Sequence, residues 1–193
     1  MNAQNLDTNS IINWINFEIS NIDGNINNFT NSKIEIVPEL VLDTAESNET
    51  MELENPLDGG FIKLYRDQNN ELRLVTVHET YTNAVNWTVD KHFYLSNNKI
   101  IYYFETKKYA VPTYSESSNT SYKIINEQVY FYENKGIRYA VKDAKGINEN
   151  ELAKIVEKKP AMMKKDFAVR GETVKTDLKK LMTTYNINAD FKS

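Results

Sequence analysis

Two histidines and two nearby acids are the residues whose types and spacing could support metal binding or acid–base chemistry. Glu79 follows His78, and Asp90 lies two positions before His92. If residues 83–86 connect the strands of a hairpin, the histidines lie on paired strands and share a face or oppose each other, depending on register. Imidazole and carboxylate groups are common metal ligands, so a small enzyme or metal-binding domain is one alternative. We favour the interpretation that both are ordinary histidines in a sheet, without a metal.

Other signatures of catalysis are missing from the sequence. The chain has no Cys, which excludes thiol catalysis and Cys-based zinc sites. It has no Gly-x-Ser-x-Gly, no His-Glu-x-x-His and no phosphate-binding Gly-rich loop. The acid pair Glu52 and Glu54 falls in a segment with few apolar residues, whereas acid–base catalysis needs rigidly held carboxylates. We therefore expect no cofactor, and a binding function rather than an enzyme.

Aromatic side chains offer the chemistry of binding instead. The sequence holds twelve Tyr and two Trp, many in short runs such as 102–104 and 130–132. Because consecutive strand residues point to opposite faces, we expect one face to bury Phe and Ile under helices and the other to present Tyr. Exposed Tyr and Trp suit contacts with a protein or a cell-surface polymer such as a saccharide. The candidates are Trp87, Tyr94, Tyr103, Tyr130 and Tyr132. The alternative is that these aromatics only form cross-strand pairs that stabilise the sheet.

Hydrophobic periodicity predicts the elements that position these residues. Apolar residues recur at steps of three and four over 9–29, which predicts an amphipathic helix. Residues 43–60 are acidic and poor in apolar side chains, which indicates a loop. Alternating patterns separated by Asn-rich turns predict a meander over 61–141, with strands at 61–66, 72–80, 88–95, 99–107, 122–125, 129–133 and 137–141. Residues 148–185 are predicted to form helices, the first of which begins after the N-cap Asn148. Pro160 and Gly171 are expected to interrupt them, and the last helix is predicted at 172–185.

This order predicts a single α+β domain over residues 1–193. It consists of an N-terminal amphipathic helix, an antiparallel β-meander of about six or seven strands, and C-terminal helices packed on one face. The Ile stripe of the first helix favours packing on the sheet. Its alternative use is as a seam between copies, which would make the chain a structural, oligomeric subunit.

Charge and hydropathy limit the partners. The net charge is -4, and residues 1–60 hold eleven acids against Lys33 as the single base. Such a chain has no general attraction for nucleic acid. No run of about 18 apolar residues is present, so we expect no transmembrane segment.

One segment resembles a known kind of protein. Residues 91–105, KHFYLSNNKIIYYFE, form a strand, an Asn turn and a strand. Together with the hairpins and the helix that follow, they resemble uncharacterised exported bacterial antiparallel-meander proteins. The resemblance implies an antiparallel sheet and export, and it carries no site residue. Ala3-Gln4 could be the remnant of a removed signal peptide, which fits a periplasmic or secreted protein. The lack of Cys fits this location and also the alternative, a cytoplasmic one.

Overall fold

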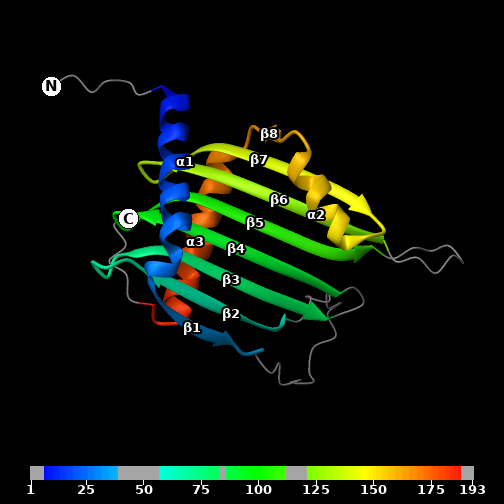
Figure 1. The fold of residues 1–193 in the computed structure, drawn as a ribbon, viewed down its shortest axis with the longest axis horizontal. Coiled ribbons are helices and arrows are strands. Elements are labelled where there is room, and N and C mark those ends of the chain that lie inside the picture. The colour runs from blue at the N-terminus through cyan, green and yellow to red at the C-terminus, as the bar shows by residue number, and fades with distance from the viewer. Residues whose placement is uncertain (1–6, 39–56, 83–85, 112–120, 188–193) are drawn as a thin grey trace, which may run out of the picture.

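A computed structural model describes residues 7–38, 57–82, 86–111 and 121–187 of the chain (Figure 1). The helices are α1 (Thr8–Asn25), the short 3₁₀ helix η1 (Ile26–Asn28), α2 (Glu149–Lys158) and α3 (Phe167–Thr184). The strands are β1 (Thr30–Ile36), β2 (Leu57–Arg66), β3 (Leu72–Thr82), β4 (Asn86–Ser96), β5 (Lys99–Val111), β6 (Ser121–Tyr132), β7 (Lys135–Gly146) and β8 (Met162–Lys164).

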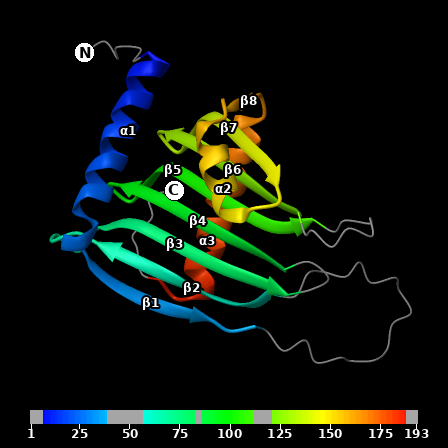
Figure 2. The same ribbon diagram turned by 45° about the vertical axis from the view of Figure 1, so that its right-hand side comes forward.

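The eight strands form one antiparallel sheet in which each strand pairs with its neighbours in sequence. Strands β1 and β8 lie at its two edges (Figure 2). The predicted α+β class, N-terminal helix and antiparallel meander are therefore confirmed. Asn97 and Asn98 adopt positive φ between β4 and β5, as expected for a two-residue hairpin turn. The segments predicted as separate strands at 122–125 and 129–133 form the single strand β6.

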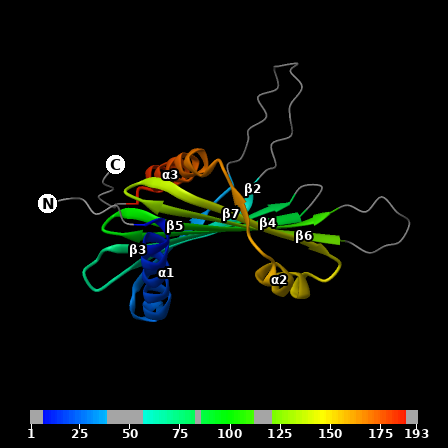
Figure 3. The same cartoon turned by 90° about the horizontal axis from the view of Figure 1, so that it is seen from above.

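Helices cover both faces of the sheet. Helices α1 and α2 lie on one face, and α3 lies on the other (Figure 3). The two C-terminal helices are therefore on opposite faces, whereas the sequence pattern placed them on one. None of the helices among the described residues is long and apolar enough to cross a membrane.

Strand alternation divides the core between the faces. Leu74 packs with Ile15 and Ile22 of α1, whereas its neighbour Val75 packs with Leu178 of α3. Ile15 and Ile22 are almost fully buried, at 0% and 1% exposure. These residues of the Ile stripe thus pack on the sheet of their own chain, as the sequence pattern favoured.

Two predicted boundaries are corrected. Residues 57–60, expected in the acidic loop over 43–60, belong to β2, where Leu57 pairs with Tyr81 of β3; positions 43–56 lie outside the described residues. Gly171, expected to interrupt the chain, lies inside α3. The N-cap prediction is confirmed, because the side chain of Asn148 accepts hydrogen bonds from the backbone of Asn150 and Glu151.

Candidate functional site

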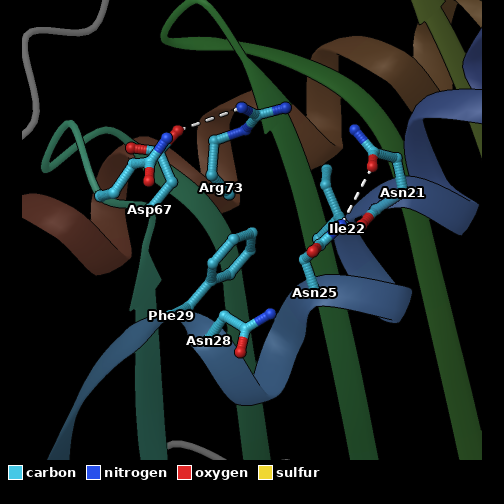
Figure 4. Close-up of a pocket in the computed structure, with 8 residues that line it drawn as sticks. Asn21, Ile22, Asn25, Asn28, Phe29, Asp67 and Arg73 are labelled. Atoms are coloured by element: carbon cyan, nitrogen blue, oxygen red, sulfur yellow. Dashed lines mark hydrogen bonds and ion pairs between the residues drawn. The ribbon is translucent and has the colours of Figure 1, made fainter.

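A cleft of about 350 Å³ lies where the end of α1 meets the turn between β2 and β3 (Figure 4). Three kinds of side chain line it. The amides are Asn21, Asn25, Asn28 and Gln68, the charged residues are Asp67 and Arg73, and the apolar residues are Ile22 and Phe29. The volume is at the lower end of the range for small-molecule sites, roughly 300–1,000 Å³.

Helical spacing places the amides on one side of α1. Asn21, Asn25 and Asn28 follow one another at steps of four and three, so they stay on one face as α1 passes into η1. The Nδ2 group of Asn25 donates to the backbone oxygen of Asn21 at 2.9 Å and to its Oδ1 at 3.1 Å. Phe29 then adopts an extended conformation, and its ring lies between Asn25 and the turn that carries Asp67 (Figure 4).

The opposite wall is the turn between β2 and β3, which Asp67 holds in shape. Its Oδ1 atom accepts hydrogen bonds from the backbone N–H groups of Asn69 at 2.9 Å and Glu71 at 3.1 Å. Asn70 completes the turn with a φ of 63°, a conformation that Asn tolerates better than most residues. Gln68, which follows Asp67, is exposed at the rim.

Arg73 joins the two walls. Its guanidinium contacts Glu18 of α1 and Asp67 of the turn, each at 3.2 Å, and its Nε donates to the backbone oxygen of Leu95 at 3.3 Å. All three charged side chains are mostly buried, with exposed fractions of 17%, 17% and 12% for Arg73, Glu18 and Asp67. One positive charge is therefore shared by two negative charges, and the local sum is −1.

Most of the aromatic residues expected at a binding surface are buried. Tyr94 and Tyr130 lie beneath α1, and Tyr103 lies beneath α3, with exposed fractions of 7%, 9% and 1%. Tyr94 donates to Asp23 of α1 at 3.0 Å. Burial, and then this carboxylate, raises the pKa of Tyr94 above its usual value. These tyrosines therefore contribute to attaching the helices to the sheet.

The other two aromatic candidates, Trp87 and Tyr132, are half-buried. Trp87 of β4 stacks on Tyr81 of β3, with ring centroids 4.2 Å apart. Its indole nitrogen is buried and makes no hydrogen bond with the described residues. This pair matches the expected cross-strand aromatic contact.

The structure brings three of the four candidate metal-ligating residues to one face. His78 and Asp90 are direct cross-strand partners, with Nδ1 and Oδ1 2.6 Å apart, and His92 follows on the same side of β4. Glu79 points to the other face, where it pairs with Lys91 at 2.8 Å. Burial lowers the pKa of His92 below its usual value. Among the described residues, no group of three or more His, Asp or Glu side chains is arranged to hold a metal ion.

A charged cluster on the α3 face has no counterpart among the predicted candidates. Glu105 and Glu127 are direct cross-strand partners on β5 and β6. Arg170 of α3 binds both carboxylates, at 3.3 and 2.9 Å, and Lys107 binds them at 2.8 and 3.7 Å. Glu105 is only 4% exposed. Each carboxylate already has two cationic partners, so the cluster serves to attach α3 to the sheet.

The residues of the cleft were also not predicted from the sequence pattern. Its one sequence signal is the spacing of Asn21, Asn25 and Asn28 beside the buried Ile stripe. Asn is abundant throughout this chain, so that spacing does not stand out, and the turn residue Asp67 is more than 35 positions away. No family model, no curated protein and no solved structure matches this chain.

Proposed function

We propose that the protein is a non-catalytic binding module whose cleft takes a neutral, polyhydroxylated ligand, such as one sugar ring of a saccharide. The observation that carries this proposal is the lining of the cleft, which combines four amide side chains with one aromatic ring. Saccharides are components of cell surfaces, so the proposal includes export of the chain.

The charges of the cleft favour a neutral ligand. An anion would need a free cation, but Arg73 is already shared between Glu18 and Asp67. A metal cation would need several oxygen ligands of negative charge, and Asp67 is the one carboxylate that lines the cleft, where it is occupied by Arg73 and two backbone N–H groups. Neither class of ion has an unoccupied partner of opposite charge at this site.

The amides match the hydrogen-bonding capacity of sugar hydroxyls. Each hydroxyl donates one hydrogen bond and accepts up to two, and each side-chain amide offers both donors and an acceptor. The contact between Asn21 and Asn25 leaves the Nδ2 group of Asn21 as a donor, and the exposed side chains of Asn28 and Gln68 make no hydrogen bond within the described part of the chain. The Phe29 ring provides an apolar surface for the C–H groups of a sugar.

The direct test is a titration of the ¹⁵N-labelled protein with glucose, galactose, mannose, N-acetylglucosamine and their short oligomers. Side-chain NH₂ signals in the NMR spectrum report each amide separately. We expect at least one saccharide to shift the signals of Asn21, Asn28 and Gln68 at increasing concentration. If no saccharide of the panel shifts these signals, or if the shifts lie elsewhere, the proposal is wrong.

Substitutions inside the cleft and at neighbouring positions outside it test which residues contact the ligand. Asn28→Ala and Gln68→Ala each remove hydrogen bonds worth about 1 kcal/mol, so the Kd should rise about fivefold. The matched controls are Asn27→Ala and Asn69→Ala, because both residues are exposed neighbours that do not line the cleft. Equal effects in the test and control variants would contradict the assignment of the site.

A further inference from the structure

An exposed apolar segment lies at the β8 edge of the sheet. The exposed fractions are 48% for Met162, 53% for Met163, 39% for Phe167 and 69% for Val169. Strand β8 and the first turn of α3 leave these four side chains at the surface. Met162 and Met163 are consecutive in β8, so their side chains lie on opposite faces of the sheet edge. Several exposed apolar side chains in one region of a folded domain commonly mark a site of interaction.

The backbone of β8 adds a second feature to this surface. Strand β8 pairs with β7 along one side, through Met162, Met163 and Lys164, and it is the last strand in the order of the sheet (Figure 2). Its other side faces no strand among the described residues. An edge of this kind can accept an additional strand through main-chain hydrogen bonds.

Lysines surround the apolar segment. Lys158 and Lys159 precede β8, and Lys164 and Lys165 lie at its end. All four are exposed, and none forms an ion pair within the described part of the chain. Asp166 is the single acid among residues 158–166. The surface therefore has an uncompensated positive charge next to its apolar residues.

From these observations we propose that β8 is a docking edge for an extended peptide segment of a partner protein that carries both acidic and apolar residues. Met162 and Lys164 share one face of β8 and Met163 points to the other, so the peptide needs an apolar residue on each of its faces. The peptide would add a ninth strand to the sheet, and its acids would contact the lysines. Methionine side chains adapt to different shapes, so Met162 and Met163 can accommodate several apolar partners. This inference is independent of the ligand proposed for the cleft.

Two other occupants fit the surface less well. Pairing of β8 with β8 of a second copy would bring four lysines from each chain together, and like charges at an edge oppose such pairing. A lipid surface would attract the lysines and the apolar side chains, but it has no strand that could pair with the backbone edge of β8. An acidic peptide satisfies the charges, the apolar side chains and the backbone together.

The test uses a fluorescent eight-residue peptide in which pairs of Glu alternate with pairs of Val, with anisotropy as the measure of binding. We expect a Kd in the micromolar range, since the edge is short. A peptide in which Lys replaces Glu should not bind. A Glu–Val peptide that is N-methylated at alternate residues should bind at least tenfold more weakly, because it cannot form the main-chain hydrogen bonds. Equal binding of the methylated peptide would overturn strand addition.

Variants of the full chain separate this site from general charge effects. The double variants Lys164→Glu with Lys165→Glu, and Met162→Ser with Met163→Ser, should each raise the Kd at least tenfold while the melting temperature stays nearly unchanged. Lys33→Glu on the opposite edge strand β1 is the matched control and should leave the Kd unchanged.

Unchanged binding of the peptide in both double variants would refute the proposal. Binding to anionic vesicles without peptide binding would favour the lipid surface, and a dimer that dissociates on Met163→Ser would favour a second copy; either result would overturn it.

Discussion

Gly171 of α3 packs directly against Gly136 of β7. A Cβ atom added to Gly171 would lie 3.0 Å from both the Cα and the backbone nitrogen of Gly136. A Cβ atom added to Gly136 would lie 2.4 Å from the backbone oxygen of Phe167. The backbone of the helix therefore contacts the backbone of the strand, which brings Val174 and Leu178 into the core of the α3 face.

Substitution of Gly171 by Ala should destabilise the protein. The added methyl group must push α3 away from β7, which costs about 1–3 kcal/mol of unfolding free energy, and Gly136→Ala should cost at least as much. Urea unfolding measures both. The control is Gly24→Ala in α1, where the new Cβ would meet nothing within 4 Å. Because Ala favours helix more than Gly does, this control should gain up to about 1 kcal/mol. A Gly171→Ala variant with the same free energy of unfolding as the wild-type protein would contradict the close packing.

Arg170 provides a polar attachment of the same helix. Replacing it with Met would leave Glu105 and Glu127 with Lys107 as their shared cation. We expect a loss of about 3 kcal/mol in the free energy of unfolding, at the low end for a broken buried ion pair because Lys107 remains. Lys175→Met is the matched control on α3, since its bond to Glu172 is exposed and should contribute less than about 0.5 kcal/mol. Equal losses in the two variants would show that the cluster does not hold the helix.

The sequence pattern predicts the elements better than it predicts their long-range partners. The Ile spacing predicts α1, and Asn97 and Asn98 predict a turn, because both features depend only on nearby residues. Strand β6 is divided in the prediction at Asn126 and Glu127, whose polar side chains break the apolar alternation. In the folded chain these residues bind Thr106 and Arg170, which are 20 and 43 positions away. Such partners cannot be inferred from local patterns.

The aromatic residues show the same limit. Alternation predicts that Tyr102 and Tyr103 point to opposite faces, and they do, since they pack in the clusters beneath α1 and α3. It does not indicate whether a helix covers the second face. The cover of that face depends on Gly136, Gly171 and Arg170, whose contacts become apparent only in three dimensions.

The lowered pKa of His92 predicts a dependence of stability on pH. Burial lowers this pKa below its ordinary value of 6.5, against the opposing effect of Asp90 and Asp23. The unfolded chain then binds the proton more readily than the folded protein does. Stability is fully present above about pH 6.5 and falls as the pH drops through the lowered pKa, by up to about 1.4 kcal/mol per pH unit.

Replacing His92 with Gln tests this dependence, because Gln has no charge at any of these pH values. Unfolding free energies of the two proteins should be measured between pH 7.5 and 5.5. The wild-type protein should lose stability more steeply toward pH 5.5 than the variant does. Parallel curves would mean that the burial of His92 does not govern the acid response in this range.

Because Glu18 and Asp67 neutralise Arg73, removing both carboxylates should allow the cleft to bind an anion. Glu18→Gln combined with Asp67→Asn would leave the guanidinium without a carboxylate, while the amide oxygen introduced at position 67 could still accept the hydrogen bonds that shape the turn. The double variant should bind inorganic phosphate in the millimolar range and shift the side-chain amide signals of Asn21 and Gln68. The wild-type protein should show no such shift at the same concentration.

Glu172→Gln, which frees Lys175 on α3, is the control for a general change of charge. Phosphate should not shift the amide signals of Asn21 and Gln68 in this variant. Phosphate binding by the wild-type protein would mean that Arg73 is not neutralised, and the preference of the cleft for a neutral ligand would lose its physical basis.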